Sequence, residues 1–212
     1  MDNTAEEQMQ PNTIEVDKPT ILQFKIIYWG PGESGKTTNF IRLGETFRSK
    51  KVSKGFSIAT TDHRTLWQDS LYFQFDFEYQ MAYKLIIQVA TCTGQERFLS
   101  TREYVVQGAD GVIFVGDSDP MRMDSNVRSY NELVAFAKQN RVPILIQLNK
   151  RDLPNRISVE EFKSVLRIPK TETDQFGHKL VYETVANKGI GVVEIFNDMV
   201  EKILYGYFSK KQ

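Results

Sequence analysis

A chain of 212 residues, 41% hydrophobic and 25% charged, has the length and composition of one α/β domain with short tails. Lys and Arg together number 27, as do Asp and Glu, so the formal net charge of zero excludes a bulk electrostatic attraction to nucleic acid. Cys92 is the only cysteine, which excludes a disulfide framework within the chain and favours a reducing, cytoplasmic compartment.

The chain itself offers no expected means of membrane attachment. No apolar run reaches the roughly 18–20 residues of a membrane-spanning helix. Asp2 stands where myristoylation needs glycine, and the ending lacks a cysteine for prenylation. We expect a polar, unstructured N-terminal tail over residues 1–18, one domain over 19–208 and a short basic tail over 209–212, in a protein that is monomeric on its own.

The first half of the domain predicts a strand, a helix and a sheet edge. Residues 24–29 are typical of a strand and 36–48 of a helix, with an exposed polar loop over 48–65. Residues 71–78 then alternate strictly between apolar and polar, which indicates a strand near a sheet edge. Nearly continuous apolar runs at 85–90, 112–115 and 144–148 are typical of strands covered on both faces, so they predict the centre of a mostly parallel sheet.

Helix signals separate the later strands. Asp119 and Pro120 predict a helix start and a helix toward residue 139, and Ser158 with Glu161 forms a capping box for a short helix ending near 166. Residues 179–186 predict the last strand, and 192–203 one apolar face of a final helix. This order predicts a three-layer α/β/α fold that binds its ligand at the carboxyl ends of the strands. Residues 13–16 leave open one more short edge strand.

The strongest motif is Gly-Pro-Gly-Glu-Ser-Gly-Lys-Thr at residues 30–37, which matches G-x-x-x-x-G-K-S/T between a predicted strand and helix. Its glycines let successive amides face inward as an anion nest, and Gly32 leaves room beside a γ-phosphate. Lys36 is expected to reach the outer phosphates and Thr37 to ligate Mg²⁺. The predicted nucleotide-binding positions of this loop are Gly30, Gly32, Glu33, Ser34, Gly35, Lys36, Thr37 and Thr38.

A second motif predicts the base. Asn149-Lys150-Arg151-Asp152 follows the apolar run 144–148, and a buried Asp152 carboxylate would accept hydrogen bonds from guanine N1–H and N2–H₂, a donor pair that adenine lacks. Asn149 is expected to tie this loop to the phosphate loop, and the Lys150 stem to lie over the ring. A weaker third element places the amide of Ala186 at guanine O6.

These elements, in this order, resemble the Ras-like small GTPases over residues 24–205. Several segments resemble one branch, the bacterial gliding-motility and cell-polarity GTPase MglA: 37–39, 62–66, 108–112, 117–118 and 149–155. Residues 94–98, Gly-Gln-Glu-Arg-Phe, instead resemble Rab and Ras relatives, which indicates a divergent member of the branch and leaves an archaeal source open. The resemblance implies a P-loop NTPase with a mostly parallel six-stranded sheet and one antiparallel strand.

The resemblance also implies roles and partners. Thr65 would close on Mg²⁺, Gly94 would sense the γ-phosphate, Gln95 would orient the attacking water, and Arg64 would serve as an arginine finger in cis alongside Lys36. GTP and GDP are the implied ligands, and a roadblock-fold, MglB-like dimer is the implied activator, with effector proteins beside it. Such partners would recruit the protein to a membrane or a cell pole.

One departure from the family keeps an alternative open. Thr91 stands where most of the superfamily has an aspartate, so it supplies no charge for metal binding. The main hypothesis is a slow, activator-stimulated GTPase switch, and the alternative is a GTP-binding scaffold with negligible hydrolysis. A heterotrimeric G-protein α subunit is excluded because the interval 48–65 is too short for its helical domain. A metabolic P-loop kinase is disfavoured because the sequence has no arginine cluster placed to form a basic lid.

Overall fold

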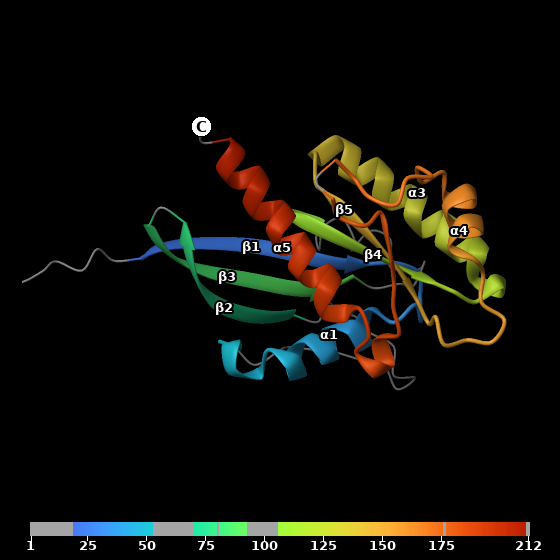
Figure 1. The fold of residues 1–212 in the computed structure, drawn as a ribbon, viewed down its shortest axis with the longest axis horizontal. Helices are drawn as coiled ribbons and strands as arrows, with labels where there is room; N and C mark the ends of the chain where they lie inside the picture. Colours follow the sequence, from blue (N-terminus) through green and yellow to red (C-terminus); the bar gives the residue numbers. More distant parts are fainter. Residues whose placement is uncertain (1–18, 53–69, 80, 93–105, 176, 211–212) are drawn as a thin grey trace, which may run out of the picture.

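A computed structural model describes residues 19–52, 70–79, 81–92, 106–175 and 177–210. Within these ranges six strands form one sheet in the order β2-β3-β1-β4-β5-β6 (Figure 1). Only β2 runs antiparallel to its neighbour, β3, while the other described neighbours are parallel, which confirms the predicted sheet. The strands are β1 Thr20–Trp29, β2 Ser70–Tyr79, β3 Met81–Thr91, β4 Gly111–Asp117, β5 Ile144–Asn149 and β6 Val181–Glu183.

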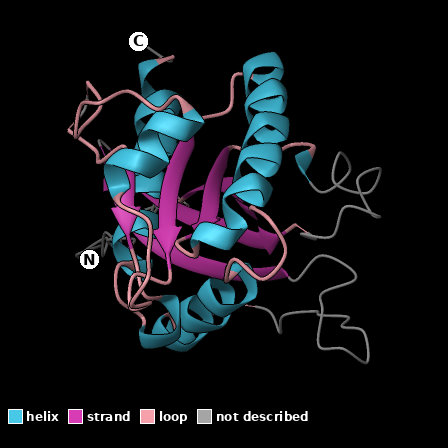
Figure 2. Ribbon diagram, turned by 90° about the vertical axis from the view of Figure 1, so that its right-hand side faces the viewer, coloured by secondary structure: helices cyan, strands magenta, loops and turns pink. Residues whose placement is uncertain are grey.

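Helices cover both faces of this sheet (Figure 2). Buried side chains of α1 and α5 pack in one apolar cluster with one face of the sheet, and those of α3 and α4 pack in a second cluster with the other face. The fold therefore has the predicted three layers. The helices are α1 Lys36–Thr46, α3 Met123–Asn140, α4 Val159–Leu166 and α5 Val192–Ser209, and short 3-10 turns are η1 Arg48–Lys50, η3 Pro120–Arg122 and η4 Ala186–Lys188.

The hydrophobic patterns correctly predict the central strands and the edge strand β2. All seven residues of β4 are buried, as expected for a strand covered on both faces. β2 lies at the sheet edge, where Leu71 and Phe73 face the core while Asp76 and Glu78 are exposed. Along α5 the predicted face of Val192, Phe196, Met199 and Ile203 is buried, so the period of the apolar residues correctly predicts this helix.

The helix boundaries confirm one capping prediction and correct another. Ser158 caps α4 as predicted, since its hydroxyl accepts a hydrogen bond from the Glu161 amide at 3.0 Å. Asp119 does not begin an α-helix directly, because its carboxylate accepts from the Met121 amide at 2.9 Å and caps the η3 turn. The α-helix begins only at Met123, as is common when a 3-10 turn precedes a helix.

Other boundaries differ because of isolated β-bridges that the hydrophobic pattern does not indicate. The last strand ends at Glu183 rather than near 186, since Val185 forms a bridge with Ile190 instead of extending the sheet. The predicted loop over 48–65 opens with the η1 turn, and Lys51 bridges to Phe73 of β2. The remainder of that loop and the optional strand at 13–16 lie outside the described residues. No described helix has the length and apolarity needed to span a membrane.

Phe196 offers a test of the core beneath β2 and α1. Its ring is 1% exposed and lies 5.4 Å from the Phe47 ring and 6.3 Å from the Phe73 ring. Phe196→Ala should lower the free energy of unfolding by about 3–5 kcal/mol, because a cavity replaces a fully buried ring. Urea denaturation measures the change, with Ile41→Ala at a half-exposed position of α1 as the control. A loss below about 1 kcal/mol would contradict this packing.

Candidate functional site

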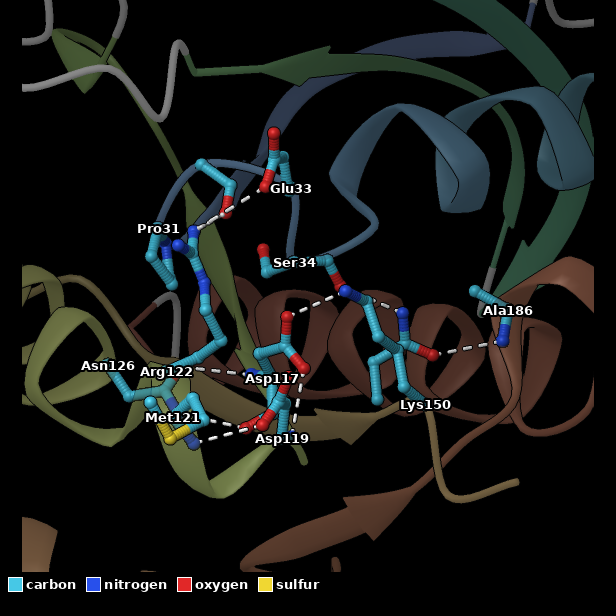
Figure 3. Close-up of polar contacts among 12 residues, drawn as sticks. Pro31, Glu33, Ser34, Asp117, Asp119, Met121, Arg122, Asn126, Lys150 and Ala186 are labelled. Atoms are coloured by element: carbon cyan, nitrogen blue, oxygen red, sulfur yellow. Dashed lines mark hydrogen bonds and ion pairs between the residues drawn. The ribbon is translucent and has the colours of Figure 1, made fainter. Parts of the chain in front are cut away.

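The candidate site lies at the carboxyl ends of β1, β4 and β5, where the predicted phosphate loop and guanine motif meet (Figure 3). Residues 30–35 connect β1 to α1, and Asp117 at the end of β4 pairs in register with Asn149 at the end of β5. Because parallel strands end at the same edge of a sheet, three segments distant in sequence are brought together there.

Two glycines of the phosphate loop are required by close packing. Gly30 and Gly35 have φ angles of 151° and 104°, which residues with a side chain rarely adopt. A Cβ on Gly30 would lie 2.2 Å from the Val115 carbonyl oxygen, and one on Gly35 would lie 2.2 Å from Asn149 Nδ2. The glycine spacing of the motif therefore reflects the contact of this loop with β4 and β5.

Several carbonyls of the phosphate loop accept hydrogen bonds from side chains. Lys36 Nζ donates to the carbonyl oxygens of Gly30 at 2.8 Å and Pro31 at 2.6 Å. Asn149 Nδ2 donates to the Ser34 carbonyl at 2.8 Å. In a trans peptide the C=O and N–H groups point in opposite directions, so the Gly35 amide faces away from Asn149. Such fixed amides are what an anion nest needs.

Ser34 provides the test of whether this loop fits a phosphate group. The residue is fully buried, and its Oγ has no hydrogen-bond partner among the described residues. A buried hydroxyl without a partner is uncommon in folded proteins and fits a site whose ligand supplies an acceptor. The position of Ser34 beside the loop amides therefore agrees with an anionic ligand.

The predicted metal ligands are described only in part. Thr37 and Thr38 stand in the first turn of α1, and both are half-buried. Among the described residues no group of three or more His, Cys, Asp or Glu side chains could hold a metal ion. Thr91 at the end of β3 is 1% exposed and carries no charge. Of the two predicted metal ligands, Thr37 lies in the described part of the chain and Thr65 lies outside it.

Asn149 joins the phosphate loop to the loop after β6. Besides donating to Ser34, its side chain accepts through Oδ1 from the Thr184 hydroxyl at 3.1 Å and from the Ala186 amide at 2.9 Å. The predicted tie between Asn149 and the phosphate loop is thus seen directly. The Ala186 amide, expected to face guanine O6, is engaged with Asn149 in this structure.

A buried polar network that the sequence analysis did not predict contacts Asn149 through the Thr184 hydroxyl. Gln147 Nε2 donates to Asn39 Oδ1 at 2.9 Å and to Thr184 Oγ1 at 2.7 Å. Asn39 Nδ2 in turn donates to the Gly35 carbonyl at 2.9 Å. All three side chains are buried, so these bonds link α1, β5 and the loop after β6. A glutamine within the apolar run 144–148 is the sequence signal that indicates such a network.

Lys150 is held by a carboxylate that sequence reasoning did not assign to the site. Its Nζ lies 2.7 Å from Asp117 Oδ2, and the Asp117 side chain is fully buried. Asn126 of α3 fixes the Asp117 backbone, accepting from its amide and donating to its carbonyl, each at 2.9 Å. The ion pair orients the Lys150 side chain, and the placement of its stem over the base stays a prediction.

Asp152 differs from the prediction, because its carboxylate is not buried. Its side chain is 31% exposed and lies 3.5 Å from Lys188 Nζ of η4. The side chain of the neighbouring Arg151 is mostly buried. Its guanidinium donates to Glu183 Oε2 and to the Ile157 carbonyl, each at 2.6 Å. The preceding residue is thus firmly anchored, and Asp152 stands at the open rim of the site.

Arg122 is a further residue that no motif indicated. It comes from the η3 turn after β4, and its Nη2 donates to the Gly32 carbonyl at 2.6 Å (Figure 3). Glu33 Oε2 lies 3.9 Å from the same nitrogen. The other predicted catalytic and switch residues, Arg64, Thr65, Gly94 and Gln95, lie outside the described ranges.

Comparisons with known proteins identify the family of the chain. The model of the ADP-ribosylation factor family, Arf, matches residues 14–203. "Mutual gliding-motility protein MglA" of Myxococcus xanthus (strain DK1622) is 33% identical over 191 residues, which cover 86% of this chain and 91% of that protein. ADP-ribosylation factor-like protein 4A of Homo sapiens is 27% identical over 189 residues, 87% of this chain and 86% of that protein. ADP-ribosylation factor-like protein 2 of Drosophila melanogaster is 26% identical over 153 residues, 71% of this chain and 73% of that protein.

Removing the Asn149 side chain tests the link between the two loops. Asn149→Ala should lower the free energy of unfolding by about 2–4 kcal/mol, because the Ser34 carbonyl, the Thr184 hydroxyl and the Ala186 amide would lose a buried partner together. Thermal or urea denaturation gives the measurement. Asn155→Ala, at an exposed position of the same connection, is the matched control. Equal stability of both variants would show that the network contributes nothing.

Proposed function

Because the chain belongs to the ADP-ribosylation factor family of Ras-like small GTPases, we propose that it binds GTP and GDP with Mg²⁺ and hydrolyses GTP slowly, changing conformation to control partner binding. The predicted likeness to Ras-like GTPases and to MglA is confirmed by the family match and by the relative at 33% identity. The family match and these relatives support a GTP-binding switch.

The observation that carries the proposal is the direct contact between the phosphate loop and the guanine motif. Asn149 Nδ2 donates to Ser34, and the Cβ-free Gly35 lies against that same nitrogen. Recognition of a triphosphate and recognition of a purine therefore depend on one shared contact. This coupling supports a nucleotide as the ligand, rather than two unrelated anion and base sites.

The proposed chemistry assigns roles to residues of both loops. The amides of residues 32–37 and the Lys36 ammonium would bind the phosphates, and Asp152 at the rim would accept from the base. The hydroxyls of Thr37 and Thr65 would hold Mg²⁺, which when bound neutralises phosphate charge. Gln95 would orient the attacking water, Gly94 would contact the γ-phosphate, and Arg64 would stabilise the charge that spreads over the transferred group.

A second function remains a specific alternative. The buried Thr91 supplies no charge near the expected metal, so a scaffold that binds GTP with negligible hydrolysis is the competing proposal. The relative MglA is a gliding-motility protein by name, and by that likeness we propose a polarity or motility role for this chain. A roadblock-fold, MglB-like dimer would be the activator, acting with effectors that place a cytoplasmic protein at a membrane or cell pole.

Asp152→Asn tests the assignment of the base. The carboxylate would accept two hydrogen bonds from guanine, whereas an amide replaces one acceptor with a donor that suits xanthine. Loss of a hydrogen bond to a charged group corresponds to an affinity loss of about 10–100-fold for GDP, with a gain for xanthosine diphosphate. Calorimetry with both nucleotides measures this, and Asp124→Asn on α3 is the matched control. Unchanged selectivity would contradict the assignment.

Single-turnover phosphate release separates the switch from the scaffold. Gln95→Leu should slow release by at least about tenfold, and Arg64→Ala should lose much of the about 10³–10⁵ that an arginine finger contributes, while both variants keep their GTP affinity. Gln139→Leu on the exposed face of α3 is the control. Release that stays undetectable in the unaltered protein, with and without a roadblock-fold dimer, would favour the scaffold. A loss of affinity would show that these residues act in binding.

A further inference from the structure

Arg122 connects the β4–α3 segment to the phosphate loop through one short hydrogen bond and one longer ion pair. Its Nη2 donates to the Gly32 carbonyl at 2.6 Å and lies 3.9 Å from Glu33 Oε2 (Figure 3). We propose that Arg122 is a positioning residue: it holds the Gly32–Glu33 peptide in its nucleotide-binding orientation and thereby slows the release of guanine nucleotide. This inference rests on the proposed nucleotide binding.

The peptide geometry explains how Arg122 would act. The described chain has no cis peptide bonds, so the N–H of Glu33 points opposite to the C=O of Gly32. Since that carbonyl is directed to Arg122, the Glu33 amide faces away from Arg122. Asn149 fixes the Ser34–Gly35 peptide in the same manner. Arg122 of the η3 turn and Asn149 at the end of β5 thus set the direction of two amides in the predicted anion nest.

The backbone at Glu33 needs such support. Its φ angle is 67°, in the left-handed region that a residue with a Cβ adopts only at a cost. Conformations of this kind persist where surrounding contacts hold them in place. The Arg122 hydrogen bond acts on the peptide immediately before Glu33, so it is suited to stabilising this conformation.

The ion pair with Glu33 is the weaker of the two contacts. Its side chains are 34% and 59% exposed and 3.9 Å apart, and exposed pairs contribute little to stability. The charge-assisted bond to the Gly32 carbonyl is shorter and belongs to the stronger class of hydrogen bonds. We therefore expect Arg122 to act mainly through Gly32, and the Glu33 carboxylate to matter less.

Arg122 is well placed for this role because its own turn is rigidly built. The Asp119 carboxylate accepts from the Met121 amide at 2.9 Å, and Asp117 Oδ1 accepts from the Asp119 amide at 3.0 Å. The second oxygen of Asp117 binds Lys150 of the guanine motif. The turn that carries Arg122 is thus anchored to the same carboxylate that orients Lys150.

The test measures release of fluorescent GDP and of a fluorescent, non-hydrolysable GTP analogue from the full chain. Arg122→Ala should release both about 10–100-fold faster, because a hydrogen bond from a charged group is lost. Arg122→Lys should give an intermediate rate, since it keeps the charge without the planar fork. Arg128→Ala, an exposed arginine of α3, removes the same charge and should release nucleotide at the unaltered rate.

Two further measurements distinguish positioning from a general structural role. The melting temperature of the nucleotide-free Arg122→Ala protein should stay near that of the unaltered chain, and the acceleration should persist in a Glu33→Gln background. Three results would each overturn the role of Arg122. They are nucleotide release from Arg122→Ala at the unaltered rate, a clear fall in the melting temperature of the nucleotide-free Arg122→Ala protein, or an acceleration that disappears in the Glu33→Gln background. If the unaltered chain binds no guanine nucleotide, the proposed function fails as well, so the two failures are distinguishable.

Discussion

The rest of the site depends on the hydrogen bonds of the Asn149 side-chain amide. One group, with a donor at one end and an acceptor at the other, holds the Ser34 carbonyl, the Thr184 hydroxyl and the Ala186 amide. Its nitrogen also occupies the space that a side chain at position 35 would need. The asparagine of one motif and a glycine of the other therefore form the two sides of a single packing contact.

A second level of polar contacts supports this centre and gives the site its rigidity. Gln147 and Asn39 fix α1 against β5, while Asp117 fixes Lys150 and the turn that carries Arg122. These groups are buried and hydrogen-bonded, and removing one partner from such a network costs more than removing an exposed pair. These contacts hold the phosphate loop, the guanine motif and the η3 turn in one connected arrangement.

The sequence predicts those parts of the fold and site that depend on local pattern. The apolar runs locate β3, β4 and β5 inside the sheet, the alternation at 71–78 locates the edge strand, and residues 30–37 locate the phosphate loop. It does not reveal the role of Arg122, which contacts a residue 90 positions earlier, or the partner of Gln147, which lies 108 positions earlier. The predicted burial of the Asp152 carboxylate is likewise wrong, because the exposure of this side chain depends on its position at the rim beside Lys188 of η4. Tertiary contacts determine these features, and the spacing of residues along the sequence does not indicate them.

The most direct test of the central claim is calorimetric titration of the full chain with GTP, GDP and ATP in the presence of Mg²⁺. A phosphate loop and a guanine loop joined through Asn149 predict tight binding of both guanine nucleotides and no measurable binding of ATP. The absence of heat with GTP and GDP, or ATP binding as tightly as GTP, would contradict the account.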